Sequence, residues 1–497
     1  MTSTASPAAQ APREAAGRGW RAVSIVLAGA FMALLDTTIV NVALPTIRSG
    51  LHASPASLEW VVSGYALAYG LALVPAGRAG DRFGHKPMFL LGLTVFVLAS
   101  VACGLSQSAA EIVAARIVQG LGAGMFYPAI AATIQLAFTG PARSKAFGVF
   151  GATIGFATAL GPLLGGLIIS AAGTGDGWRW IFFVNLIIGA VTVPLAAWQL
   201  PRSEPSRRRG FDLPGFALLT AGLLLLLIPL IEGEADGWPA WCLACFGACV
   251  VVFALLAAWE ITAERRGGDP LLNPGLLRQT SFSAGAIFAV AYFAGFSSVF
   301  FTLSILWQEG LGHTALITGL VGAPFSVGSL VSAANSDKLS ARMGRMVLVT
   351  GCVLVLAGLA LAILVVHLTA PSPDGWYLIG PLLLAGLGNG MVIAPNQDFV
   401  LASVPPKEAG TASGILSTAQ RLGTAIGIAV IGTVLFGTLH LSSASARSGP
   451  QAVARAFTHS AQLALLTNLA FVIISLVLVV ALPRRIPGHD NTERTRS

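Results

Sequence analysis

Fourteen separate runs of apolar residues, each about as long as a bilayer is thick, dominate this sequence. A membrane-spanning helix needs about 20 consecutive, predominantly apolar residues. Because backbone polar groups in lipid must be satisfied internally, we expect an all-α integral membrane protein with fourteen transmembrane helices. The runs occupy residues 22–45, 57–77, 88–106, 110–133, 145–170, 180–200, 213–231, 239–259, 281–302, 315–336, 346–368, 376–397, 410–436 and 462–482.

The composition of the 497-residue chain supports the same conclusion. Hydrophobic residues make up 55% of it and charged residues only 10%, with a mean hydropathy of +0.79. An average soluble chain has about 25% charged residues, so lipid must cover much of this molecule. The net charge of +8 does not indicate a nucleic-acid partner, because the Lys and Arg residues of membrane proteins collect in cytoplasmic loops.

The distribution of basic residues predicts the orientation in the membrane. With the N-terminus in the cytoplasm, twenty-three of the 29 Lys and Arg residues fall in cytoplasmic segments and two lie inside spans. The outer loops contain only four, which are Arg48, Arg179, Arg447 and Arg455. Adding or omitting one helix would destroy this alternation. The bias therefore predicts an even helix number, both termini in the cytoplasm, and insertion in the cell membrane.

An internal repeat divides the chain into two similar halves. The glycine-rich segment Gly120–Met125 in the fourth run recurs as Gly386–Met391 in the twelfth. The same offset pairs three further glycines: Gly148 with Gly414, Gly161 with Gly427, and Gly166 with Gly432. Runs four and five therefore match runs twelve and thirteen, which predicts two related six-helix halves.

The expected architecture is two pseudo-symmetric six-helix bundles with two extra helices inserted between them. Two related halves with a binding site at their interface are typical of transporters. We expect the chain to act as a monomer. The predicted units are a cytoplasmic tail 1–20, a first bundle 21–200, a linker with the two extra helices 201–280, a second bundle 281–483, and a cytoplasmic tail 484–497.

An acidic residue, Asp36, lies deep in the first predicted span. A charge there costs about 2.5–3.5 kcal/mol, so it must face a cavity or a partner. Arg116 and Gln119 in the fourth span lie at a similar depth, because a helix rises 1.5 Å per residue. Two interpretations are open. The pair is either a site of proton coupling, in which protonation of Asp36 switches off its attraction to Arg116, or a static buried ion pair.

The loop between the second and third spans predicts a conformational gate. Its pattern is Gly77-x3-Asp81-Arg82-x-Gly84-x-Lys86, in which the glycines permit a tight turn. Asp81 can accept from basic side chains or from a helix N-terminus across the interface of the halves. The alternative is an ordinary basic cytoplasmic loop.

The fifth span contains a run of glycines around a proline: Gly155, Gly161, Pro162, Gly165 and Gly166. Glycines permit close contact between helices, and an internal proline removes a backbone hydrogen bond and favours a bend. We expect this segment to rock or seal against a neighbouring helix; close packing alone is the alternative.

Polar and aromatic residues in the spans are candidates for lining a substrate cavity. The tyrosines could instead anchor the chain at the membrane interface, and Arg421 could satisfy a helix carbonyl. Five acidic residues, Glu59, Glu232, Glu234, Asp236 and Glu309, are expected at the solvated outer surface. The cavity candidates are Asn41, Tyr65, Tyr69, Gln119, Asn389, Gln420 and Arg421.

Nothing in the sequence indicates a cofactor or a metal. The phosphate-binding pattern G-x4-G-K-[ST] does not occur, and the seven His residues form no cluster within a span. The five Cys residues all lie in apolar runs, where small packing residues are the default interpretation. A membrane-embedded enzyme is therefore disfavoured, and an ion gradient is the expected energy source.

These motifs resemble those of the major facilitator superfamily. Gly77–Pro87 is similar to its loop signature, Arg116 with Gln119 to a fourth-span signature associated with proton coupling, and Gly155–Gly166 to the fifth-span signature of antiporters. The run Leu35–Pro45, the fourteen spans and the segment Trp178–Asn185 resemble the fourteen-helix drug:proton antiporter branch. The resemblance covers nearly the whole chain.

The resemblance implies proton-coupled efflux of small apolar or amphipathic compounds, such as drugs, antibiotics or secondary metabolites, by alternating access. An importer or uniporter of a small nutrient is the alternative, which the fifth-span signature disfavours. The chain departs from the branch in two places. The second-half loop Ser336–Arg345 is degenerate, and the span 315–336 contains no acid. The missing acid argues against dicationic substrates and favours neutral, weakly acidic or monocationic ones.

Overall fold

The computed structural model describes residues 7–138, 140–173, 175–201, 212–233, 237–268, 270–271, 274–370, 373–402, 404, 409–439 and 449–482. Within these residues helices are the only regular secondary structure, and 14 of them are long and apolar enough to cross a membrane. The predicted fold class is confirmed. The C-terminal tail 484–497 and the basic stretch 202–211 lie outside the described residues, as do Lys407 and Arg447.

The helices of the first unit are α1 (Pro7–Leu51), α2 (Pro55–Phe83), α3 (His85–Leu105), α4 (Ala109–Ala137), α5 (Gly140–Ala172) and α6 (Gly177–Gln199). Two further helices follow, α7 (Leu213–Glu232) and α8 (Ala240–Arg265), and then the single turn α9 (Pro274–Leu277). The last unit comprises α10 (Thr280–Ile305) with a π-helical turn η1 (Leu306–Gly310), α11 (Ala315–Ala333), α12 (Ser336–Met343), α13 (Met346–Thr369), η2 (Gly375–Leu378), α14 (Ile379–Ala402), α15 (Ala409–Gly437), α17 (Pro450–Leu478) and η3 (Val479–Ala481).

The largest differences from the predicted runs occur at the two chain-terminal helices. Helix α1 begins well before its apolar run, and α17 begins at Pro450 rather than at residue 462. An apolar run marks only the part of a helix that needs an apolar environment, whereas the backbone hydrogen bonds can continue into polar sequence. In α17 the polar residues Thr458 and Ser460 are buried, and the Thr458 hydroxyl donates to the Ala454 carbonyl (2.7 Å).

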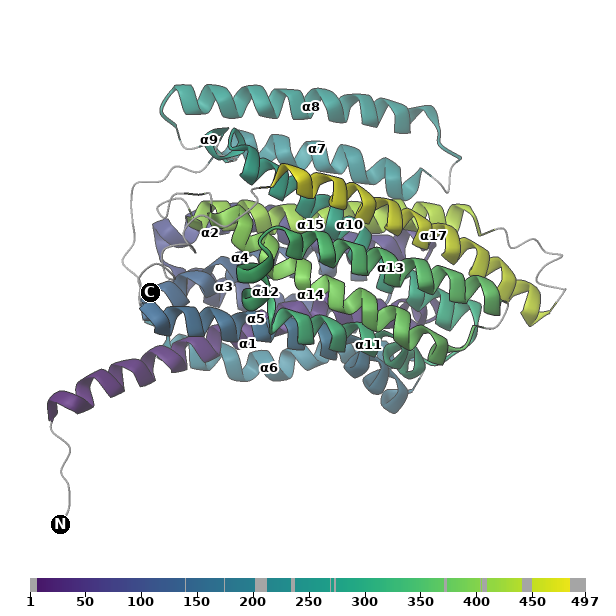
Figure 1. The fold of residues 1–497 in the computed structure, drawn as a ribbon, viewed down its shortest axis with the longest axis horizontal. Coiled ribbons are helices and arrows are strands. Elements are labelled where there is room, and N and C mark those ends of the chain that lie inside the picture. The colour runs from purple at the N-terminus through teal and green to yellow at the C-terminus, as the bar shows by residue number, and fades with distance from the viewer. Residues whose placement is uncertain are drawn as a thin grey trace, which may run out of the picture.

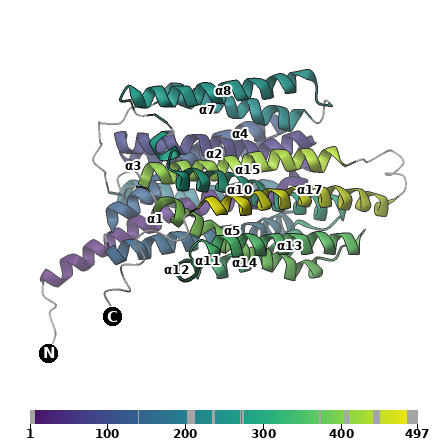
Figure 2. The ribbon, with the colours of Figure 1, turned by 45° about the horizontal axis from the view of Figure 1, so that its top comes forward.

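The long helices lie roughly side by side and form two bundles (Figures 1 and 2). Helices α1 to α6 pack mainly among themselves, and so do α10, α11, α13, α14, α15 and α17. The bundles meet along three helix pairs: α2 with α15, α5 with α11, and, less extensively, α1 with α10. Each pair joins one helix of the first half to one of the second, as expected for two related halves facing each other.

The two extra helices stand on one side of the molecule, with α8 outermost (Figure 1). Helix α7 packs against both α2 and α15, and α8 packs against α7. The Trp60 indole N–H of α2 donates to Glu232 of α7 (2.8 Å), and the Thr433 hydroxyl of α15 donates to the Leu230 carbonyl of α7 (2.6 Å). Helix α7 therefore contacts both bundles along one of their shared seams.

The repeated glycines explain why the two halves have the same packing. In α4, a Cβ added at Gly120 would collide with the backbone of α2, and one added at Gly122 would collide with α3. In α14, Gly386 stands in the same relation to α11, and Gly388 to α13. Each glycine lets its helix approach the neighbouring helix until their backbones are in contact. The glycine repeat in the sequence therefore corresponds to a repeat of helix–helix contacts.

Another repeated pair lies at the seams between the bundles. A Cβ added at Gly166 of α5 would lie 2.7 Å from the Ala315 carbonyl oxygen of α11. Its counterpart Gly432 of α15 lies against the side chain of Glu59 on α2. The α5–α11 and α2–α15 seams are therefore equivalent under the pseudo-symmetry.

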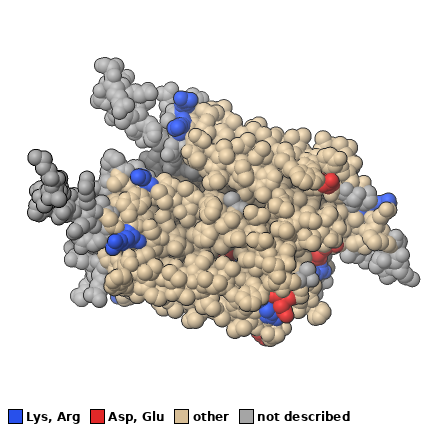
Figure 3. Space-filling view, turned by 90° about the horizontal axis from the view of Figure 1, so that it is seen from below, with Lys and Arg blue, Asp and Glu red and all other residues tan. Residues whose placement is uncertain are grey.

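The outer surface has the character of a lipid-facing belt. Figure 3 shows one face on which the coloured Lys, Arg, Asp and Glu residues lie mostly toward the two ends of the bundle, with a broad and largely uncharged band between them. Large apolar side chains are exposed on the outward helices, among them Trp198 of α6 and Leu243 of α8. In lipid such exposure carries no cost.

Two glycines of α14 test the packing explanation. An added Cβ at Gly390 would collide with the Ser329 carbonyl and the Ser332 side chain, whereas Gly380 is exposed with nothing within 4 Å. We expect Gly390→Ala to destabilise the folded protein by about 1–3 kcal/mol through overpacking. Gly380→Ala should be neutral or slightly stabilising, because Ala is the better helix former.

The measurement is the melting temperature of each purified variant in the same detergent, followed by size-exclusion chromatography. Equal melting temperatures for the two variants would contradict the role assigned to Gly390.

Candidate functional site

The carboxylate of Asp36 lies at the centre of a hydrogen-bond network inside the first bundle. Its Oδ2 accepts from the Arg116 guanidinium of α4 (2.5 Å), and its Oδ1 accepts from the Gln119 amide (2.8 Å) and from the Asn185 amide of α6 (3.0 Å). Arg116 and Gln119 are three residues apart and share one face of α4. Two helices, α4 and α6, thus supply three donor side chains to one buried acid on α1.

The partners of Asp36 are themselves held in place. Besides Asp36, Arg116 donates to the Val61 carbonyl of α2 (3.0 Å) and to the Gln119 side-chain oxygen (2.8 Å), and its guanidinium lies 4.0 Å from the Tyr65 ring centroid. The Asn185 amide also donates to the Ser100 hydroxyl of α3 (3.0 Å). A buried ion pair is tolerated when further hydrogen bonds satisfy both partners, and this network meets that condition.

The network is closed to solvent. Asp36 and Asn185 are each 1% exposed, and Arg116 and Gln119 are 0% exposed. The sequence left two surroundings open for Asp36, a cavity or a partner, and in this structure it has partners, all within the first bundle. In this conformation the carboxylate cannot exchange a proton with water.

The glycine–proline segment of α5 lies directly beside the helix that carries Asp36. Gly161 and Gly165 leave room for Thr38 and Ile39 of α1, because an added Cβ at either glycine would collide with them. On its other side the segment faces the second bundle, where the Pro162 carbonyl approaches Gly319 of α11. The segment therefore packs against α1 and α11 at once.

Two of the predicted antiporter-segment residues complete the α5–α11 contact. Gly166 lies against the backbone of α11, and Gly155 faces Leu330, whose side chain would be 3.0 Å from an added Cβ. Gly148 and Gly151, nearer the start of α5, have nothing within 4 Å of an added Cβ. Of the α5 glycines, those that reach α11 thus lie between residues 155 and 166.

A small cavity occurs where α1, α5, α10 and α11 meet. Asn41 lines it, and within the described part of the chain its side-chain oxygen has no hydrogen-bond partner. The other lining residues are Val42, Pro162, Phe300, Leu303, Ser304, Thr318 and Gly322. This is the position between the bundles at which a substrate cavity was expected, and Asn41 is the predicted cavity residue that the structure places there.

The other cavity candidates lie elsewhere. Tyr65, Tyr69 and Gln119 belong to helices of the first bundle and are buried, with at most 1% of each residue exposed. Asn389 is buried in the second bundle, where it accepts from the Tyr292 hydroxyl (2.9 Å) and donates to the Ser329 hydroxyl (2.8 Å). In this conformation these side chains make protein contacts, and their role in lining a substrate cavity stays a prediction.

Gln420 and Arg421 of α15 are part-buried. The Cβ of Arg421 would lie 3.0 Å from a Cβ added at Gly70 of α2, and its guanidinium lies 4.2 Å from the Tyr69 ring centroid. Arg421 therefore reaches from the second bundle onto the first.

The predicted gate loop forms the sharp turn between α2 and α3. Gly84 has a φ of 101°, which favours glycine, and Gly80 gives space to the His85 ring. Asp81 lies 3.5 Å from His85, and the Lys86 ammonium donates to the Leu200 carbonyl at the end of α6 (2.8 Å).

Two other loop residues, Gly77 and Arg82, make lighter contacts: Gly77 faces Pro128, and Arg82 lies over the Phe83 ring. A contact that leaves the first bundle comes from Arg78, which was not among the predicted gate residues. Its guanidinium donates to the carbonyls of Pro270 and Leu271, in the linker that precedes α10. Among the predicted gate residues, Asp81 and Lys86 act within the first bundle.

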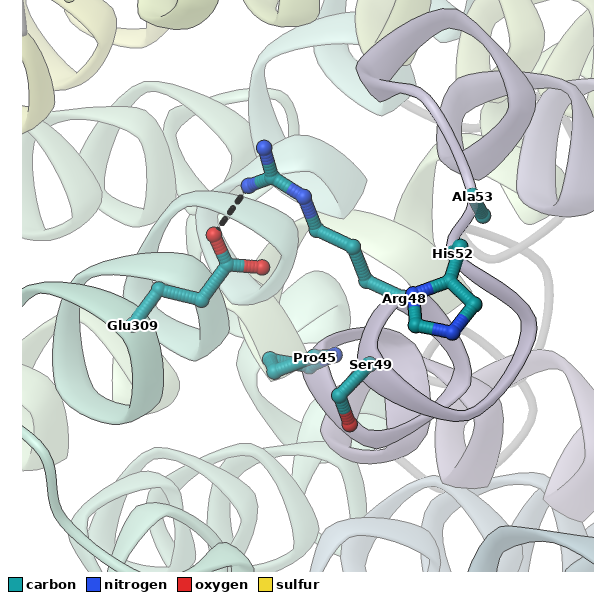
Figure 4. Close-up of a pocket in the computed structure, with 6 residues that line it drawn as sticks. All are labelled: Pro45, Arg48, Ser49, His52, Ala53 and Glu309. Carbon is teal, nitrogen blue, oxygen red and sulfur yellow. Dashed lines mark hydrogen bonds and ion pairs between the residues drawn. The ribbon is translucent and has the colours of Figure 1, made fainter.

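An ion pair joins the two bundles at the end of α1. Arg48 of α1 donates to Glu309 of η1, and both line an open pocket of about 470 Å³ (Figure 4). Nearby, the Gln308 amide donates to the Val42 carbonyl (2.8 Å). The sequence predicted Arg48 and Glu309 as separate surface charges. No pattern in the sequence relates two residues 261 positions apart, so only the fold reveals this pair.

Comparisons with known proteins agree with this geometry. Residues 26–428 match the model of the Major Facilitator Superfamily. The chain is 36% identical over 449 residues to the probable actinorhodin transporter of Streptomyces coelicolor, covering 88% of this chain and 78% of the relative. It is 32% identical over 482 residues to the puromycin resistance protein pur8 of Streptomyces alboniger, covering 96% and 93%.

Solved structures agree at the level of the fold. A POT family peptide transporter in an auto-inhibited form has a TM-score of 0.66 and 15% identity, covering 93% of this chain and 96% of that one. The helix arrangement, the family model and the relatives converge on one conclusion: the chain belongs to the Major Facilitator Superfamily and is a multi-pass membrane transporter.

Proposed function

We propose that this transporter exports small apolar or amphipathic compounds in exchange for protons, by alternating access of a site between its two bundles. The observation that carries the proposal is the buried Asp36–Arg116 network, on a helix that packs directly against the glycine–proline segment at the seam. Related proteins named for export or antibiotic resistance support the direction of transport. The energy source is the proton gradient, with no cofactor, and the acting unit is a monomer.

Protonation of Asp36 would change the packing of α1. A neutral carboxyl attracts the Arg116 guanidinium far less than a carboxylate does, so the pair is weakened when a proton binds. Thr38 and Ile39, two and three residues beyond Asp36, contact Gly161 and Gly165 of α5. A shift of α1 would therefore act on α5, which contacts the second bundle. This path connects the proton site to the seam between the bundles.

The sealed network also requires a gate for the proton. Because Asp36 is closed to water in this conformation, proton exchange must occur in another one. In the proposed cycle the carboxylate is charged while substrate loads from the cytoplasm. It binds a proton from outside after substrate release.

The contacts between the bundles support an outward-closed state. With both termini in the cytoplasm, the Arg48–Glu309 pair and the Gly166–Ala315 contact lie toward the outer face. Gly148 and Gly151 lie in the cytoplasmic half of α5, where no neighbour approaches an added Cβ. Alternation then consists of separating the outer contacts and closing the cytoplasmic ends.

Asp36→Asn tests the proton site. We expect the variant to lose efflux driven by a pH gradient while retaining substrate exchange across the membrane without a gradient, because Asn can accept hydrogen bonds but cannot carry the proton. The measurement is transport by everted vesicles or proteoliposomes of a compound to which the wild-type chain confers resistance.

The matched control is Asp176→Asn, which removes an acid whose side chain is 80% exposed at the end of α6. It should transport like wild type. Size-exclusion profiles verify folding of both variants. Gradient-driven efflux by Asp36→Asn at the wild-type rate would remove Asp36 from the mechanism.

The outer ion pair yields a second prediction. We expect Glu309→Gln to weaken the outward-closed state by about 1 kcal/mol, since the pair is part-exposed, which is about a five-fold change in population. Ser304→Cys, in the small cavity between the bundles, reports the opening through its labelling by a membrane-impermeant maleimide applied from outside.

The charge-swapped protein, Arg48→Glu with Glu309→Arg, should return labelling toward the wild-type rate. The parent chain without the introduced cysteine gives the background. Unchanged labelling in Glu309→Gln would show that the pair does not hold the outer end closed.

A further inference from the structure

A second intramembrane arginine, the part-buried Arg421, lies near the middle of its helix. It is 12 residues from the start of α15 and 16 from its end, which places it about 18 Å and about 24 Å from the two helix ends. A charged residue at such depth is costly and normally marks a functional position with a partner. The groups around Arg421 therefore indicate what kind of partner its positive charge requires.

The two intramembrane arginines differ in how they are satisfied. Arg116 has a carboxylate, a carbonyl and an amide oxygen as acceptors. Among the residues that the structure describes, Arg421 has no acidic partner; its guanidinium lies 4.2 Å from the Tyr69 ring centroid and interacts with the Tyr69 hydroxyl. Arg421 is also part-buried, whereas Arg116 is fully buried.

Tyr69 supplies no negative charge to the Arg421 guanidinium, and the N–H groups that Tyr69 does not engage stay available at the edge of the guanidinium plane. A guanidinium has five N–H donors in its plane and no acceptor, and this fork matches a carboxylate in two parallel hydrogen bonds. The surroundings are aromatic, because the Tyr69 ring is itself in edge contact with Tyr65 and Tyr127 at 5.8 Å and 5.7 Å. When the two bundles separate along this seam, a planar anion would find both a charge partner and aromatic surface here.

We propose that Arg421 is the recognition group for an anionic substituent, a carboxylate or an acidic phenolate, on an aromatic substrate. The inference rests on the proposed function and narrows its substrate class. An anionic lipid headgroup presents similar chemistry, but Arg421 lies too deep for a headgroup at either membrane surface. The anion must therefore be carried by a molecule that enters between the bundles.

The position of Arg421 also connects this site to the acid. Tyr65 and Tyr69 are one helical turn apart on α2; Tyr65 lies against Arg116, and Tyr69 against Arg421. A substrate anion on Arg421 would be separated from Asp36 by the two stacked pairs of arginine and tyrosine. Movement of α2 on binding would therefore reach Arg116 directly.

The test is a binding measurement on the purified full-length protein in detergent, with no proton gradient. The probes are three matched pairs: naphthalene-2-, anthracene-2- and anthraquinone-2-carboxylate, each with its neutral carboxamide. We expect at least one carboxylate to bind at least about ten-fold more tightly than its amide, measured by tryptophan quenching and by the rise in melting temperature.

Arg421→Gln should remove this preference, and Arg421→Lys should retain part of it, since Lys keeps the charge but lacks the planar fork. The control Arg455→Gln removes an exposed arginine of α17 and should leave the preference intact. If Arg421→Gln does not fold, the difference in affinity between acid and amide for the wild-type protein still tests whether the site prefers an anion.

Equal binding of acids and amides, no binding of any acid, or a preference that survives in Arg421→Gln would each overturn the inference. The binding assay uses no proton gradient, so failure of the proton-coupling proposal would leave the wild-type protein's preference for acids unchanged. Loss of proton coupling as the mechanism is therefore distinguishable from loss of the anion site.

Discussion

One buried ion pair organises the first bundle. Asp36 and Arg116 neutralise each other in a region where either charge alone would be costly, and the helices around them supply the remaining hydrogen bonds. Removing one partner of such a pair typically costs about 3–5 kcal/mol, because the other charge stays buried. Helices α1, α2, α4 and α6 converge on this ion pair. They are therefore held together by buried hydrogen bonds and charge as well as by packing.

The contacts between the bundles are of a different kind. Along α5 and α11 they consist mostly of glycines against backbone, and along α2 and α15 of a few hydroxyl–carbonyl hydrogen bonds, such as Thr418 to the Gly70 carbonyl (3.0 Å). Close packing of this sort is strong only while the surfaces match. Bundles joined at seams of small residues can move as units, which is the requirement for rigid-body alternation.

The two intramembrane arginines differ in whether their contacts stay within one bundle or cross to the other. Arg116 is fully satisfied within its own bundle, whereas Arg421 extends from the second bundle onto a tyrosine of the first. Tyr65 and Tyr69 place both guanidinium groups along one helix. Changes in charge at either arginine would therefore act on α2, a helix that lies at a seam and also contacts α7.

The sequence by itself determined the all-helical membrane fold, the fourteen spans and the two related halves. The length of an apolar run and the spacing of glycines are local properties, and they directly decide which segments enter lipid and which helices can pack closely. It also predicted that Asp36 and Arg116 lie at the same depth. Tertiary structure decided which side chains meet. Asn185 donates a further hydrogen bond to Asp36, and Glu309 forms an ion pair with Arg48. In this conformation Tyr65 and Tyr69 stack on arginines. Depth along a helix follows from residue number, but the direction in which a side chain faces depends on how neighbouring helices rotate and pack. That is a non-local outcome, which no single segment of the chain encodes.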